Sequence, residues 1–185
     1  FGSQHYGLQP DLITIAKGLT SAYAPLSGSI VSSKMFDVLM DGTDETGPIG
    51  HGWTYSAHPI GAAAGIANLK LIDELGLIDN AGRVGSYLLQ GMRQALKGHA
   101  HVAEVRGDGL AMAVELMDDP DGRQFFDPAR KVGPAVTTAL LRRGVIARAM
   151  PEGDILGFAP PLCLSEAEAD TITGATAEAV REVLG

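Results

Sequence analysis

The chain has 185 residues, 45% of them hydrophobic, and its 14 lysines and arginines stand against 22 aspartates and glutamates, a formal charge of -8. This length suffices for one sizeable core or two small ones, and an acidic chain without a basic cluster is a poor match for nucleic acid. Cys163 is the only cysteine, which excludes an internal disulfide and favours a reducing, cytoplasmic location. No stretch reaches the roughly 18 uninterrupted apolar residues of a membrane span.

The first predicted element is a short strand. An apolar and β-branched run at residues 12–15 follows Pro10 and stops before Gly18, which favours a buried strand over a helix. Lys17 lies just past its end. The simplest interpretation is a lysine whose stem lies along apolar surface while its ammonium reaches water. Keeping a buried lysine neutral would instead cost roughly 4 to 5 kcal/mol, which requires a chemical purpose.

Periodicity and turn signals predict the remaining elements. Up to residue 76 these are a strand at 27–32, a short helix at 35–40, a loop at 41–52, and a helix after Pro59 with Ile66, Leu69, Ile72 and Leu75 on its apolar face. From residue 77 they are a helix ending near Gly98, strands at 102–106 and 110–117 around a turn at 107–109, a helix at 134–143, strands at 145–148 and 155–158, and a last helix. Ser165 and Glu168 have capping-box spacing and mark the start of that helix.

Residues 50–59 form a second informative stretch, Gly-His-Gly-Trp-Thr-Tyr-Ser-Ala-His-Pro. It combines hydroxyl groups, backbone N–H groups and the start of a helix, and this combination binds phosphate well. A simpler interpretation is that Ser56 caps the helix and Trp53 fills a packing gap.

Taken together, Lys17 and this second stretch resemble a known family. The similarity lies in residues 9–19, Gln-Pro-Asp-Leu-Ile-Thr-Ile-Ala-Lys-Gly-Leu, and in residues 25–28, 50–59, 105–110 and 155–162. Together these stretches resemble the class III aminotransferases, in particular their ω-aminotransferase branch, and the likeness covers essentially the whole chain. The family implies an α/β enzyme of fold type I that uses pyridoxal 5'-phosphate. Residues 1–76 would then be the incomplete end of the cofactor-binding large domain, and residues 77–185 a small C-terminal α+β domain.

The resemblance also implies roles for individual residues. Lys17 is expected to form the Schiff base with the cofactor aldehyde and then to move a proton, which calls for a neutral, sheltered amine. Thr54, with Trp53 beside it, is expected to bind cofactor, and the threonine would reach the phosphate of the neighbouring subunit in a homodimer with shared active sites. Arg148 aligns with a movable clamp for the substrate carboxylate, although a solvated strand-end charge remains an alternative. In many members another arginine lies near the position of Gly157, and this sequence lacks it.

The implied activity is transfer of an amino group from an amine or ω-amino acid to a keto acid such as pyruvate. Because the chain opens with Phe1 rather than methionine, we expect it to be a C-terminal piece of such an enzyme that is inactive alone. The alternatives are a non-catalytic association or scaffold fragment, and a pyridoxal-phosphate aminomutase or racemase of the same family. The expected partners are small amines and keto acids, with neither nucleic acid nor membrane. His99 and His101 lack neighbouring ligands in the sequence, so no metal site is expected.

Overall fold

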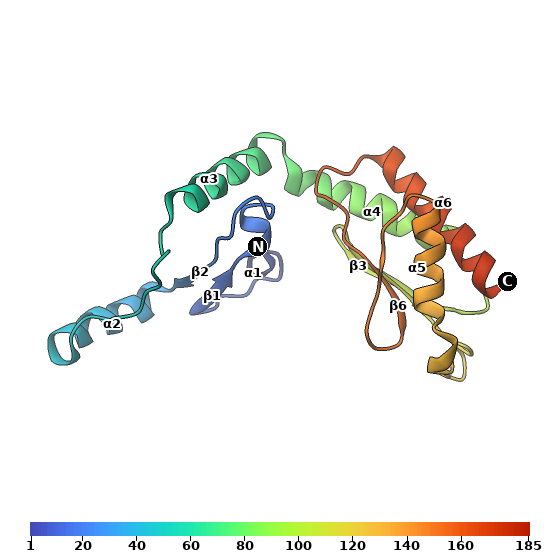
Figure 1. The fold of residues 1–185 in the computed structure, drawn as a ribbon, viewed down its shortest axis with the longest axis horizontal. Coiled ribbons are helices and arrows are strands. Elements are labelled where there is room, and N and C mark those ends of the chain that lie inside the picture. Colours follow the sequence, from blue (N-terminus) through green and yellow to red (C-terminus); the bar gives the residue numbers. More distant parts are fainter. The chain divides into compact units, whose positions relative to one another are not determined.

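The computed structural model describes all 185 residues, and they divide into two compact units, Phe1–Leu75 and Gly76–Gly185 (Figure 1). Gly76 stands at the junction with a left-handed backbone, φ 58°, a conformation that glycine adopts without steric cost. None of the helices combines the length and the apolar character that crossing a membrane requires.

The first unit contains a two-stranded antiparallel sheet and a long helix. Its elements are α1 (Gly2–His5), β1 (Leu12–Ile15), the 3-10 turn η1 (Lys17–Leu19), β2 (Gly28–Val31), α2 (Ser33–Thr46) and α3 (Pro59–Glu74). Lys17 follows the end of β1, as the sequence predicts. The prediction of a buried strand is wrong for this chain, because β1 and β2 pair only with each other and leave their side chains exposed or half-buried.

Helix α2 is longer than the sequence predicts and takes in the first half of the expected loop. Thr43 and Thr46 donate their hydroxyls to backbone carbonyls one turn earlier, at 2.9 and 2.8 Å, and so remain compatible with a helix. Gly47, with φ 81°, ends it. The irregular segment that leads to α3 therefore begins at Gly47 rather than at residue 41.

Helix α3 packs through its small residues. Gly61 and Gly65 are its buried positions, and a side-chain carbon added at Gly65 would lie 3.0 Å from the Leu26 side chain. The large apolar residues predicted to face a core are exposed or half-buried in this chain: Ile66, Leu69, Ile72 and Leu75. That prediction is wrong because α3 contacts the segment before β2 through Gly61 and Gly65 instead of through its large apolar residues.

The second unit is an α+β arrangement of one sheet and three long helices. Its elements are α4 (Leu77–Ala95), β3 (Val102–Asp108), β4 (Ala111–Leu116), the 3-10 turn η2 (Pro128–Arg130), α5 (Val132–Arg142), β5 (Arg148–Ala149), β6 (Asp154–Phe158) and α6 (Glu166–Leu184). The strands are antiparallel in the order β3-β4-β6-β5, and the helices lie together beside the sheet (Figure 1). The largest fully buried apolar side chains are Leu88, Met92, Leu116, Leu140, Leu156, Val84, Val114, Val136 and Val180.

The β3–β4 turn and strand β5 of this unit differ from the prediction. Asp108 pairs with Ala111, so the β3–β4 turn contains only the two residues between them and is shifted from the expected 107–109. Strand β5 is confined to Arg148–Ala149, the residues that pair with β6, instead of extending over 145–148.

The capping box predicted for the last helix is confirmed. The Ser165 hydroxyl oxygen accepts the backbone N–H of Glu168 at 3.3 Å, and a Glu168 carboxylate oxygen accepts the backbone N–H of Ser165 at 2.8 Å. This backbone hydrogen bond, followed by one from the Ser165 hydroxyl, holds the pKa of Glu168 below its ordinary value. The first turn of α6 is therefore stabilised by an ionised carboxylate.

Replacing Ser165 with alanine is expected to lower the free energy of unfolding by about 1 kcal/mol at neutral pH, the usual effect of losing an N-cap. Because the folded pKa of Glu168 is depressed, its contribution is present above its ordinary pKa near 4.3 and is lost as the pH falls through the folded value. Urea unfolding at about pH 7 and pH 3 should therefore show a smaller difference between the two proteins in acid. A difference that grows in acid would contradict this assignment.

Candidate active site

Lys17 lies in a strained turn between β1 and β2. Its φ is 53°, in the left-handed region that non-glycine residues rarely adopt. Ser21 and Ala22 follow with φ of 49° and 63°. Such residues persist where the surrounding structure holds them, and they cluster at functional sites. The backbone that carries the lysine is therefore a candidate functional segment by its geometry alone.

Two adjoining cavities of the first unit meet at this lysine. Their volumes are about 830 and 740 Å³, and both are lined by Lys17, Ser27, Trp53 and Ser56. The larger also includes residues that precede α3, and the smaller also includes residues of β1 and β2. Lys17 itself is exposed. This chain by itself therefore does not provide the shelter that the resemblance implies for the amine.

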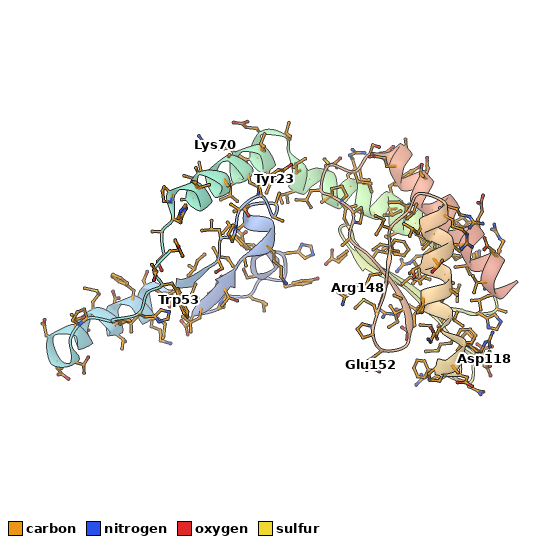
Figure 2. The ribbon with its side chains drawn as sticks, in the orientation of Figure 1. Tyr23, Trp53, Lys70, Asp118, Arg148 and Glu152 are labelled. Atoms are coloured by element: carbon orange, nitrogen blue, oxygen red, sulfur yellow. The ribbon has the colours of Figure 1, made fainter.

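The loop before α3 brings Trp53 to the cavities. Ser56 accepts the Trp53 backbone N–H at 2.9 Å, so its hydroxyl closes a turn in the loop instead of capping α3, whose N-cap is His58. The Trp53 side chain, labelled in Figure 2, is exposed and contacts the His51 ring edge-on at 5.6 Å. Thr54 is exposed and lines neither cavity.

The donor set of the two cavities suits a phosphorylated aromatic aldehyde such as pyridoxal phosphate. Lys17 offers an amine for the aldehyde, the hydroxyls of Ser27 and Ser56 are suited to a phosphate, and Trp53 offers an aromatic face for a ring. Neither cavity is lined by an aspartate or glutamate. A carboxylate partner for the pyridine nitrogen must therefore come from outside these cavities.

Arg148 lies in the second unit, on the β5–β6 hairpin that Figure 2 shows with Glu152 near its tip. It is exposed, and Gly157 is directly opposite it on β6. The same register continues through Ala113 of β4 to Arg106 of β3. Because directly opposed residues of antiparallel strands point to the same side, the two arginines share one face of the sheet with small residues between them.

These two arginines have different surroundings. Arg106 is paired with Glu104 and Glu115 at 2.8 and 2.5 Å, and the hydrogen bond to Glu115 is the main cause of its raised pKa. Arg148 forms no salt bridge within the chain. Beside it, a side-chain carbon at Gly157 would lie 3.2 Å from the Met150 sulfur. Arg148 is therefore the guanidinium of this row that is free to bind an anion.

The surroundings of the two histidines of the second unit, His99 and His101, suit a structural role. The Nδ1 of His101 lies 3.1 and 3.0 Å from the carbonyl oxygens of Met117 and Asp118. The Nε2 of His99 is buried without a hydrogen-bond partner, and burial, followed by the charges of His101 and Arg181, lowers the pKa of His99. No group of three or more potential metal ligands occurs in the structure.

The sequence patterns missed Asn68 of α3, which forms three hydrogen bonds with the turn after Lys17. An available signal was its position on the same helix face as Gly61 and Gly65, since residues spaced by three, four and seven lie one above another on a helix. A polar residue on the packed face of a helix has to find a partner.

The chain is similar to several known proteins over almost its whole length. The family described as aminotransferase class-III matches residues 1–180. Diaminobutyrate–2-oxoglutarate transaminase of Halomonas elongata is 56% identical over 183 residues, which are 99% of this chain and 39% of that protein. Putrescine–pyruvate aminotransferase of Pseudomonas aeruginosa is 37% identical over 172 residues, or 93% of this chain and 36% of that protein.

Solved structures agree with these sequence relationships. A structure from work on the directed evolution of transaminases by ancestral reconstruction has a TM-score of 0.96 and 60% identity, and the match covers 99% of this chain and 40% of that chain. An (S)-enantioselective ω-transaminase from Thermomicrobium roseum has a TM-score of 0.92 and 40% identity, with coverage of 100% and 40%. The chain thus spans about two fifths of the length of these proteins. The fold class expected from the sequence, that of the fold type I transferases, is confirmed.

Proposed function

Since this chain belongs to the class III aminotransferases, a pyridoxal-phosphate-dependent family, we propose that it is the lysine-bearing part of a transaminase that moves an amino group from an amine or ω-amino acid to a keto acid such as pyruvate. The observation that carries the proposal is the position of Lys17 where two cavities with hydroxyl and aromatic linings meet. Diaminobutyrate and putrescine, named in two relatives, both carry a primary amine at the end of a short chain. They support a donor of that class.

In this proposal, Lys17 holds the cofactor through its amine and, once released, moves a proton at the substrate Cα. The bound cofactor supplies the electron sink that makes this proton labile. A lysine serves as a base only when it is unprotonated, which shelter from water favours. Because Lys17 is exposed in this chain, its cover would come from the rest of the enzyme or from a second subunit.

We extend the proposal to a homodimer with shared active sites, in which residues 1–76 complete the large domain and 77–185 form the small one. The exposed Thr54 lines neither cavity of its own chain, so its hydroxyl is available to the cofactor phosphate of a neighbouring subunit. The exposed Trp53 would contact the cofactor near its own Lys17.

The direct test is to incubate the full-length protein and the 185-residue chain with pyridoxal phosphate, and to record absorbance before and after borohydride reduction. A yellow band in the full-length protein that borohydride fixes to the chain supports the proposal, and its absence in the shorter chain supports the expected lack of activity alone. Without a band in either protein, the scaffold alternative is favoured. A fixed cofactor without amino transfer to any keto acid favours an aminomutase or racemase.

Arg148→Ala is expected to lower kcat/KM for the keto acid roughly 10- to 150-fold, the effect of losing hydrogen bonds to a carboxylate worth about 1.5–3 kcal/mol. A donor amine without a carboxylate should react at the original rate in the first half-reaction. Arg142→Ala is a matched control, because Arg142 is another exposed arginine of this unit but is paired with Glu182. Equal losses for donors with and without a carboxylate would contradict the clamp.

A further inference from the structure

Asn68 connects helix α3 to the turn that carries Lys17. Its side-chain amide donates hydrogen bonds to the carbonyls of Gly18 and Leu19, at 2.9 and 3.2 Å. Its side-chain oxygen accepts the Ser21 hydroxyl at 2.6 Å. No other side chain of α3 forms a hydrogen bond with this turn. The side-chain amide and the side-chain oxygen of Asn68 therefore both bond to residues that directly follow Lys17.

The residues that follow the turn are also held in place, by a hydrogen bond of their own and by packing on α3. Thr20 is 2% exposed, and its hydroxyl donates to the carbonyl of Ala24 at 2.6 Å. A side-chain carbon added at Gly61 would lie 3.3 Å from the carbonyl oxygen of Pro25, so α3 approaches the end of the segment closely. Helix α3, which carries Asn68, is therefore packed closely against the end of the segment that follows the turn.

The strain of this turn requires such an anchor. Lys17, Ser21 and Ala22 each have positive φ, a conformation that these residue types leave unless their surroundings oppose it. Two of the bonds from Asn68 reach Gly18 and Leu19, which lie between Lys17 and Ser21, and the third reaches the hydroxyl of Ser21 itself. Removing them frees the backbone at Gly18, which is the residue best able to rotate.

We propose that Asn68 is a positioning residue: it holds the strained turn in the one conformation that presents the Lys17 amine to the two cavities. This inference rests on the proposed function of Lys17. It adds a determinant in α3 that lines neither cavity and acts through the backbone of Gly18 and Leu19 and the hydroxyl of Ser21.

The test uses the full-length enzyme, stripped of cofactor, and measures the rate at which pyridoxal phosphate becomes fixed to Lys17 by cyanoborohydride, across a range of pH. Asn68→Ala is expected to slow this labelling between about 10- and 100-fold, as misplacement by an ångström does for other reacting groups. The slowing should be the same at every pH, because Asn68 sets the position of the Lys17 amine. The labelling rate does not depend on turnover.

Asn80 provides the matched control. From α4 its side-chain amide donates hydrogen bonds to the carbonyls of Leu162 and Leu164, at 2.8 and 3.0 Å. Asn80 thus forms the same pair of amide hydrogen bonds as Asn68, but in the unit that lacks Lys17. Asn80→Ala should lose comparable stability in urea but keep the original labelling rate. Ser21→Ala, which removes only the bond to the Asn68 oxygen, should slow labelling to a smaller extent and covers the case in which Asn68→Ala does not fold.

The outcomes separate this inference from the function on which it rests. If the unaltered enzyme labels at Lys17 and both Asn68→Ala and Ser21→Ala keep its rate, the positioning role is overturned and the proposed function stands. Loss of labelling in Asn80→Ala to the same extent as in Asn68→Ala also overturns it, since the effect would then be one of stability. If the unaltered enzyme does not label at Lys17, the proposed function itself fails.

Discussion

Replacing Lys17 with alanine in the full-length protein is expected to lower the rate of amino transfer by at least about 10²- to 10⁴-fold, the usual contribution of a positioned acid–base group. Loss of the covalent attachment adds to that figure. The measurement is keto-acid consumption at saturating cofactor, so that weakened cofactor binding does not obscure the loss of proton transfer.

Lys70→Ala is the control for this experiment. Lys70 projects from the outer side of α3 (Figure 2), is exposed and lines neither cavity, so the variant should keep the original rate. An unchanged rate in Lys17→Ala would contradict the role given to this residue. Equal losses in both variants would point to a general charge effect.

The second large effect is expected at Gly85 of α4. A side-chain carbon there would lie 2.1 Å from the carbonyl oxygen and 2.3 Å from the carbonyl carbon of Gly109, in the β3–β4 turn. The atoms in the way are backbone, so no side-chain rotation can relieve the clash. Gly85→Ala should therefore lower the free energy of unfolding by about 3 kcal/mol or more, at the upper end of overpacking effects.

Gly82 supplies the comparison on the same helix. A carbon added there meets no atom within 4 Å. Gly82→Ala should stabilise the protein by about 0.5–1 kcal/mol, because alanine is the better helix former. Urea unfolding of both variants measures the contrast. Similar stabilities for the two variants would mean that α4 does not pack this closely on the turn.

Much of the second unit could be predicted because its signals are local. Ser165 and Glu168 identify the start of α6 through two hydrogen bonds that span only three residues. The apolar residues Val84, Leu88 and Met92 of α4 recur every four positions in the sequence, and all three are fully buried. In such segments the periodicity of the sequence and the burial on folding coincide.

The first unit was harder to predict, because its contacts are not periodic. Helix α3 uses Gly61 and Gly65 for packing and leaves large apolar residues exposed, which reverses the rule that the apolar stripe faces the core. Thr43 and Thr46 belong to a segment whose composition is typical of a loop, yet they lie in α2, where the hydroxyl of each donates to a backbone carbonyl. In both places, tertiary or side-chain bonding outweighs composition.

The candidate site was predictable in position but not in conformation. The apolar run before Lys17 correctly places the lysine after a strand. Its positive φ could not be foreseen, since lysine has no preference for that region. The anchor at Asn68 is 51 residues away along the chain and depends on how α3 packs, which no local pattern encodes.

Peptide mapping by mass spectrometry, after borohydride reduction of the full-length protein with its cofactor, tests the role of Lys17 most directly. We expect one pyridoxyl group per chain on the peptide that contains Lys17, and none on peptides containing Lys34, Lys70, Lys97 or Lys131. A pyridoxyl group on one of those other lysines, with Lys17 unmodified, would contradict the proposed function.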